Sequence, residues 1–216
     1  MRNFFNIFVL LVLNLSLTAQ AQEITEMGYS ESHRQNKKYS LTAQPAGLGP
    51  VGIYSNAITF GYFLNPKSIV EVEYLEGKNF VFLGDLFDRL RYKVQSFGVY
   101  YKLFFSNTFY GRFGANSRIV DYHSDSDNWL SGNSTETYDF RGHAFNATFS
   151  LGNQWQWENF TLGCEWVGLE LPISKDISSQ KYSGNYATQS ALDEKTDRFL
   201  KQSSINLVHL YLGLSF

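Results

Sequence analysis

Hydrophobic and polar residues alternate along most of the chain after its first 37 residues. A period of two is typical of β-strands whose two faces meet different surroundings. Eight segments show this alternation, and they match the roughly 9 to 11 residues, or slightly more, of a tilted membrane-crossing strand. They lie at 38–47, 51–63, 68–77, 92–104, 108–122, 140–155, 159–171 and 204–216. The pattern predicts an all-β fold of eight antiparallel strands in a single domain.

The connections between these segments alternate between two lengths. Short turns lie at 64–67, at 105–107 and around Glu158, whereas longer polar stretches lie at 78–91, 123–139 and 172–203. Short periplasmic turns and long external loops are typical of outer-membrane barrels. We therefore predict an eight-stranded antiparallel up-and-down transmembrane β-barrel over residues 38–216, with both ends of the barrel chain on the same side.

The two faces of the predicted strands differ in a way that favours a membrane. In the last segment the polar face carries His209, Tyr211, Gly213 and Ser215, and the opposite face is apolar throughout. That apolar face consists of Val208, Leu210, Leu212, Leu214 and Phe216. A lipid-facing band must be apolar, and a narrow lumen is filled by small side chains and a few charges.

Aromatic residues gather at the predicted strand ends. Those beside the short turns are Tyr62, Phe63, Phe104, Phe105, Phe109, Trp155, Trp157 and Phe160. Those beside the long loops are Tyr74, Tyr92, Tyr122 and Phe140. Such belts anchor a barrel at the level of the lipid headgroups. The alternative, a soluble β-protein with these rings in its core, does not explain why they cluster at strand ends.

The composition agrees with an all-β membrane protein and excludes other classes. Aromatic residues make up 17% of the 216 residues, and charged residues only 18%, with 4 Pro and 1 Cys. These values exclude a disordered chain and a disulfide scaffold. The formal net charge of −2 gives no reason to expect a nucleic-acid partner.

The first 21 residues have the layout of a secretory signal peptide. Arg2 precedes an apolar core from Phe4 to Leu17, and Ala19-Gln20-Ala21 offers small residues for cleavage. We expect residues 1–21 to be the signal peptide, 22–37 an N-terminal periplasmic segment and 38–216 the barrel. No later segment has the roughly 18 consecutive apolar residues of a transmembrane helix. The predicted location is the bacterial outer membrane.

Charged residues on the inward faces of the predicted strands are the candidate site. They are Glu71, Glu73, Lys102, Arg112, Arg118 and Glu165. Buried charges are costly unless they are paired, so we predict a salt-bridge network in the lumen. The network serves either as a polar plug that holds the barrel together or as part of a gated path.

Motifs for metal binding and catalysis are weak. Asp125, Asp127, Asn133 and Glu136 have the spacing of a calcium loop, but Leu130 occupies the place where a glycine makes the turn. A histidine beside Ser and Asp at 123–127 suggests a lipid A-modifying enzyme, yet no acylase or deacylase pattern matches. We expect no catalytic residues, no metal site and no cofactor.

The end of the chain carries the most specific motif. Leu210, Leu212, Leu214 and Phe216 alternate with small or polar residues and close on a C-terminal phenylalanine. This pattern resembles the small eight-stranded outer-membrane barrels of Gram-negative bacteria, the OmpA/OmpX-like superfamily. The resemblance implies that these four residues form the signal that the barrel-assembly machinery reads.

The expected role is structural or surface-interactive, carried by the external loops. The expected partners are outer-membrane lipid and lipopolysaccharide, the assembly machinery, and an extracellular ligand or cell-surface partner, with no nucleic acid. Two alternatives stay open. The first is a porin-like narrow channel for ions or small solutes, and the second is a lipid A-modifying enzyme.

Overall fold

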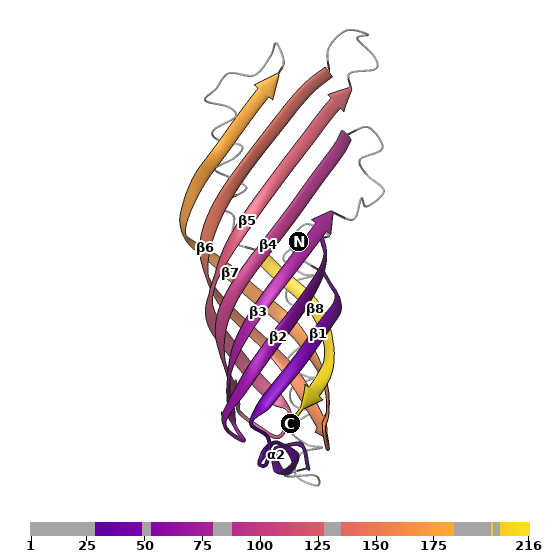
Figure 1. Ribbon diagram of the computed structural model, residues 1–216, viewed down its shortest axis with the longest axis vertical. Helices are drawn as coiled ribbons and strands as arrows, with labels where there is room; N and C mark the ends of the chain where they lie inside the picture. Colours follow the sequence, from indigo (N-terminus) through magenta and orange to yellow (C-terminus); the bar gives the residue numbers. More distant parts are fainter. Residues whose placement is uncertain (1–28, 49–52, 80–87, 128–134, 184–199, 201–203) are drawn as a thin grey trace, which may run out of the picture.

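The computed structural model describes residues 29–48, 53–79, 88–127, 135–183, 200 and 204–216. Its elements are α2 (Tyr29–Arg34), β1 (Tyr39–Leu48), β2 (Ile53–Asn65), β3 (Ser68–Asn79), β4 (Asp88–Phe104), β5 (Phe109–Asp127), β6 (Thr135–Trp157), β7 (Phe160–Ser183) and β8 (Ser204–Ser215). Each strand pairs antiparallel with its neighbours in sequence, and β1 pairs with β8, so the sheet closes into a barrel (Figure 1). The predicted fold class is confirmed.

Strands β4 to β7 are longer than the alternation predicted. β5 continues to Asp127, β6 starts at Thr135 and β7 continues to Ser183, so much of the loops expected at 123–139 and 172–203 is strand. Along these extensions both faces of a strand carry polar or mixed residues, and the alternation that marks a half-buried strand is lost. These extensions rise past the ends of β1, β2, β3 and β8 as a projecting sheet (Figure 1).

The outer surface of the barrel is apolar. Ile58, Phe97, Phe113, Phe149 and Leu214 are all exposed, as their places on the outward face of the pleat require. Closure leaves the barrel without a sheet edge at this level, so the strands satisfy one another's backbone groups. This surface fits a hydrocarbon environment rather than water.

The predicted aromatic belts are correct only in part. Tyr62, Tyr74, Phe105, Trp157 and Phe160 are exposed on the outer surface. The side chain of Tyr92 lies outside the described residues. Phe63, Phe104, Tyr122 and Phe140 are instead buried inside the barrel. Successive strand residues point to opposite faces, so Phe63 cannot share the outward face with Tyr62.

Two of the register shifts in the ladder involve an extra residue in the strands that line the lumen site. Relative to β6, β7 has one extra residue at Trp166, and relative to β1, β8 has one extra residue at Val208. Val208 has a φ of 51°, which is rare for a β-branched residue. Each extra residue exchanges the two faces of the strand that follows it.

The predicted signal peptide lies outside the described residues. The part of the predicted periplasmic segment that is described contains the short helix α2, which lies below the end of the barrel where the chain terminates (Figure 1). Within the described ranges, no helix is long and apolar enough to cross a membrane.

Candidate functional site

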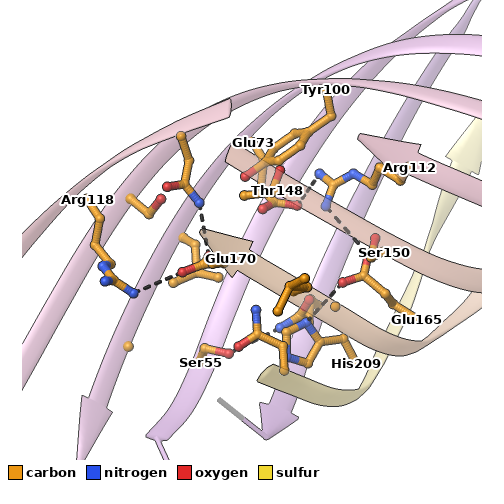
Figure 2. Close-up of a pocket in the computed structure, with 18 of the residues that line it drawn as sticks. Ser55, Glu73, Tyr100, Arg112, Arg118, Thr148, Ser150, Glu165, Glu170 and His209 are labelled. Atoms are coloured by element: carbon orange, nitrogen blue, oxygen red, sulfur yellow. Dashed lines mark hydrogen bonds and ion pairs between the residues drawn. The ribbon is translucent and has the colours of Figure 1, made fainter. Parts of the chain in front are cut away.

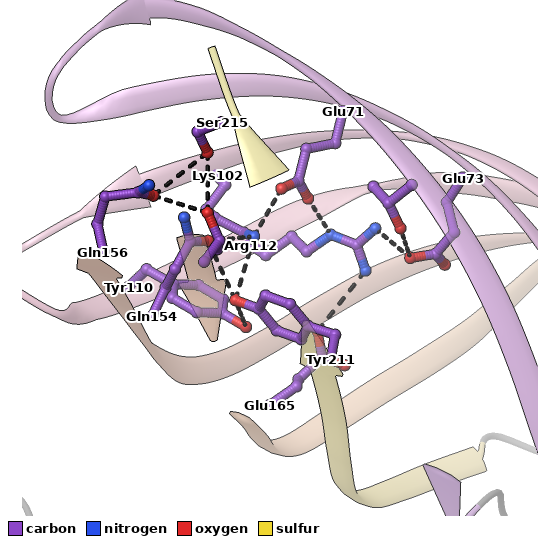
Figure 3. A network of polar contacts seen from close by, with 12 residues as sticks. Glu71, Glu73, Lys102, Tyr110, Arg112, Gln154, Gln156, Glu165, Tyr211 and Ser215 are labelled. Carbon is purple, nitrogen blue, oxygen red and sulfur yellow. Dashed lines mark hydrogen bonds and ion pairs between the residues drawn. The ribbon is translucent and has the colours of Figure 1, made fainter. Parts of the chain in front are cut away.

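Charged side chains from four strands meet in the lower half of the lumen (Figure 3). The carboxylate of Glu71 on β3 accepts hydrogen bonds from Lys102 Nζ at 2.6 Å and from Arg112 Nε at 2.8 Å. Arg112 Nη2 donates to Glu73 at 2.6 Å, and its Nη1 lies 3.6 Å from a Glu165 oxygen. Arg112 therefore bridges three carboxylates, and we call these five residues the lower network.

Strand register explains why these residues meet. Lys102 on β4 is directly opposite Arg112 on β5, and Glu71 and Glu73 lie two residues apart on the same face of β3. Inward residues of neighbouring strands in an eight-stranded barrel converge on a lumen just wide enough for side chains. Because the lumen is narrow, side chains of opposite charge from different strands lie within hydrogen-bond distance of one another.

Aromatic rings and amides complete the packing of the lower network. Arg112 stacks over the Tyr100 ring at 3.6 Å, and Lys102 lies 4.6 Å from the ring centroid of Tyr110. Lys102 also donates to Gln154 at 3.1 Å. Such cation–π contacts strengthen when both groups are shielded from water. Glu71 and Lys102 are only 4% and 3% exposed, so the charges depend on one another rather than on solvent.

Arg118 does not join the lower network. It donates to Glu170 on β7 at 2.9 Å, and Asn116 donates to the other oxygen of the same carboxylate at 3.0 Å. Glu170 is a site residue that sequence reasoning missed. Strict alternation from Glu165 places Glu170 on the outer face, and the extra residue at Trp166 turns it inward. We call Arg118 and Glu170 the upper pair.

A polar chamber of about 80 Å³ lies between the lower network and the upper pair (Figure 2). Glu73, Arg112, Arg118 and Glu170 contribute to its wall, together with His209. His209 is a second residue that the prediction did not include, and its Nδ1 lies 3.8 Å from a Glu165 oxygen. A chamber of this size holds a few water molecules and is too small for the 300 Å³ or so of a typical ligand pocket.

Apolar clusters lie above and below the chamber in the lumen. The upper apolar cluster consists of Val94, Val120, Tyr122, Tyr138, Phe140 and Leu200. The lower apolar cluster consists of Phe63, Ile69, Phe104 and Tyr110. The lower network, the chamber and the upper pair therefore lie between two apolar clusters within the described part of the barrel.

The residues of the expected assembly signal lie on the outer face of the barrel. Leu210, Leu212 and Leu214 on β8 are exposed, as is Phe216 at the end of the chain. Their recognition by the assembly machinery stays a prediction.

The structure bears only in part on the calcium-loop spacing. Asn133 lies outside the described residues, and the side chains of Asp125, Asp127 and Glu136 are likewise not described. Among the described residues, no group of three or more His, Cys, Asp or Glu side chains is arranged to hold a metal ion.

The sequence matches no protein family and no curated protein. The fold does match solved structures. A major outer membrane protein from Thermus thermophilus has a TM-score of 0.55 at 11% identity, covering 84% of this chain and 100% of that one. Ail, the attachment invasion locus protein of Yersinia pestis, gives 0.46 at 14% identity, covering 83% and 99%. CarO of Acinetobacter baumannii gives 0.45 at 13%, covering 84% and 98%. The match to the Thermus thermophilus protein shows that this closed barrel is a fold found among outer-membrane proteins.

Proposed function

We propose that this barrel is an integral protein of the bacterial outer membrane that holds its projecting sheet clear of the lipid for contacts at the cell surface. The observation that carries the proposal is the continuation of β5, β6 and β7 as folded sheet beyond the apolar band. Its barrel acts as a closed anchor, and the partner is an extracellular ligand or a component of another cell surface.

The outward face supports this placement because its character changes along the strands. Phe97 and Phe145 are exposed lower down, whereas ion pairs occupy the outward face further up. Lys93 lies 3.5 Å from Glu76, and Arg141 lies 3.4 Å from Asp121. Exposed ion pairs of this kind are stable in water or among headgroups but not in hydrocarbon. The change marks the outer boundary of the membrane.

The closed lumen supports an anchor rather than an open pore. Buried ion pairs and two apolar clusters occupy the described interior around a chamber of about 80 Å³, and such a core rigidifies a small barrel. We propose no catalytic role, because the buried histidine His209 lines a chamber of about 80 Å³, which is too small for a lipid substrate.

The remaining partners follow from the same placement. We propose that the outer band contacts membrane lipid and lipopolysaccharide. We further propose that the assembly machinery inserts the chain by reading Leu210, Leu212, Leu214 and Phe216. A C-terminal strand that presents alternating apolar side chains on one face supports both proposals.

The first experiment locates the sheet on intact cells. In a Cys164→Ala background, we expect Ser179→Cys on the projecting part of β7 to react with a membrane-impermeant maleimide. Leu212→Cys on the apolar band is the matched control and is expected to stay unlabelled. Both variants must show the heat-dependent gel shift of a folded barrel. Labelling of Leu212→Cys, or a failure of Ser179→Cys to react in the folded barrel, would contradict the placement.

The second experiment tests the surface role. Residues 124–138 are replaced by Asn-Gly, a favoured two-residue hairpin turn that joins the paired positions His123 and Asp139. Cells carrying the full chain or the shortened chain are applied to a panel of immobilised extracellular proteins and polysaccharides. We expect the shortened barrel to keep its heat shift and to lose the binding. Equal binding by both chains, or no binding by the full chain, would leave only the anchor role.

A further inference from the structure

The short helix α2 lies across the periplasmic mouth of the barrel and is bonded to it on several sides (Figure 1). Ser30 Oγ accepts a hydrogen bond from the backbone N–H of Gln156 at 3.1 Å, near the turn between β6 and β7. The N–H of Glu31 donates to Asn107 Oδ1 at 3.0 Å in the turn between β4 and β5. Arg34 Nε donates to the carbonyl of Pro66 at 2.8 Å in the turn between β2 and β3. The helix therefore contacts the turn between β2 and β3, the turn between β4 and β5, and the end of β6.

Arg34 is the residue that α2 inserts most deeply. It is 1% exposed, and its guanidinium carbon lies 3.8 Å from the centroid of the Phe104 ring, which belongs to the lower apolar cluster. Burial lowers the pKa of Arg34 to about 10, which leaves the side chain charged at neutral pH. A charged group packs against an aromatic face with a gain from the cation–π interaction, and its long apolar stem fills space.

The helix α2 is held in place by its contacts with the barrel. A six-residue helix is not stable alone in water, so its order comes from these contacts. An exposed ion pair between Glu31 and Lys67 at 3.6 Å adds little to them. The residues that hold α2 are thus the buried ones, Ser30 and Arg34, and both point toward the barrel mouth.

The layer directly above α2 is polar and fully enclosed. Thr161 and Ser215 are 0% exposed, and both are hydrogen bonded to the side chain of Gln156, at 2.8 and 3.2 Å. The lower network lies beyond this layer. Polar groups so close to the end of a strand are normally exposed to water, so their complete burial calls for a cover over the mouth.

We propose that α2 is a stopper that seals the periplasmic entrance of the lumen, with Arg34 as the side chain that holds it in place. The stopper separates water from the polar layer of Gln156, Thr161 and Ser215 and from the lower network behind it. It makes the barrel closed from the periplasm whatever the projecting sheet binds, so this inference does not depend on the surface role proposed above.

The test measures access to the layer behind the helix. Ser215→Cys in a Cys164→Ala background places a thiol there with little change in size, and the purified barrel in detergent micelles is treated with a charged, membrane-impermeant methanethiosulfonate. With α2 intact we expect slow labelling. Adding Arg34→Ala should raise the rate about tenfold or more, because local opening becomes more frequent.

A matched control comes from the same helix. Ser32 is exposed, and its hydroxyl donates to the carbonyl of Tyr29 within α2. Ser32→Ala should leave the labelling rate within about twofold of the parent, since it removes no contact with the barrel. The heat-dependent gel shift shows that every variant remains a folded barrel.

Two outcomes would overturn the stopper. The first is a folded Arg34→Ala barrel that labels at the parent rate. If Arg34→Ala loses the heat shift, Asn107→Ala carries the test, because it releases the start of α2 from outside the lumen. Loss of the fold in both variants is the second overturning outcome, since α2 would then be part of the barrel fold rather than a separable closure.

Discussion

Single residues in the lumen differ from surface residues of the same type because of what surrounds them. Arg112 is buried among three carboxylates and a tyrosine ring, whereas Lys93 holds one carboxylate in a half-exposed position. Removing one partner of a buried pair leaves an unpaired charge in a poorly solvated place. Removing one partner of an exposed pair leaves a charge that water accepts.

Arg112→Ala should therefore destabilise the barrel by about 3–5 kcal/mol. Lys93→Ala, the matched control, should change the free energy of unfolding by no more than about 0.5 kcal/mol. Urea unfolding in lipid vesicles, followed by tryptophan fluorescence, measures both. A small effect of Arg112→Ala would mean that the lower network contributes little to stability.

Glycines in the lumen wall are a second residue-scale feature. A methyl group on Gly114 would overlap the carbonyl oxygen of Val99 and the Cα of Tyr100. These are backbone atoms, and they cannot move without distorting the strand. A methyl group on Gly168 would meet only side-chain atoms, the nearest being a Glu165 oxygen at 3.2 Å. At Gly168 the neighbouring side chains can shift to make room for a methyl group, whereas at Gly114 the neighbouring backbone cannot.

Gly114→Ala should cost about 1–3 kcal/mol through overpacking, while Gly168→Ala should cost clearly less. The same unfolding measurement applies, with the heat shift as the check on folding. Equal costs at the two positions would argue that the backbone around Gly114 relaxes freely.

The residue-scale predictions from the sequence depended on the period of two. Glu71, Lys102 and Arg112 lie on regular strands, and the structure places them inside as the alternation requires. Glu170 follows an extra residue, and no local pattern announces that insertion. His209 faces the lumen as expected, but a single histidine gave no reason to include it among the charged groups.

At the scale of the element, β8 stores strain at one position. Val208 adopts a positive φ where β8 has an extra residue relative to β1. For a residue with a Cβ, the left-handed conformation costs roughly 1–2 kcal/mol, and glycine avoids this cost. The expected order of glycine and alanine is therefore inverted at Val208 compared with an ordinary strand position.

Val208→Gly should be more stable than Val208→Ala by about 1 kcal/mol. At Leu212, a regular outward position of the same strand, the glycine variant should instead be less stable than alanine by roughly 0.5–1 kcal/mol. Comparing glycine with alanine cancels the loss of the lipid-facing side chain at each site. The same order at both positions would show that Val208 is not strained.

The existence and order of the strands could be predicted, but not their full length. A strand that is lipid-exposed on one side and lumen-facing on the other must alternate, and each barrel segment was therefore recognisable. The extension of β7 toward Ser183 carries Ser178, Ser179 and Lys181 without such a contrast. Cross-strand packing, as between Tyr122 and Tyr138 at 5.9 Å, holds the extensions and depends on residues far apart in sequence.

At the scale of the whole molecule, the barrel is a stack of layers along its axis. From the end that carries α2, the layers are α2, the lower apolar cluster and its polar neighbours, the lower network, the chamber, the upper pair Arg118 and Glu170, and the upper apolar cluster. An ion that crosses this stack must pass both apolar layers and separate buried ion pairs. Each step is costly in a medium of low dielectric constant.

The purified barrel should accordingly be silent in planar lipid bilayers at neutral pH. Insertion is checked independently by protease protection of the same protein in vesicles. Discrete current steps from the unaltered chain would contradict the layered closure and would favour the narrow-channel alternative over the anchor.

The seam between β1 and β8 has a consequence for how long the barrel survives. The two strands lie far apart in the sequence, and their pairing is interrupted twice, between Ala43 and Ala46 and between Gly47 and Leu48. At the end near α2 the backbone N–H groups of Lys38 and Tyr39 both donate to the carbonyl of Phe216. Because this pairing joins the two ends of the barrel chain and is interrupted twice, we expect the barrel to open along it, so that the lifetime of the folded state depends on this one pairing rather than on the average strength of the sheet.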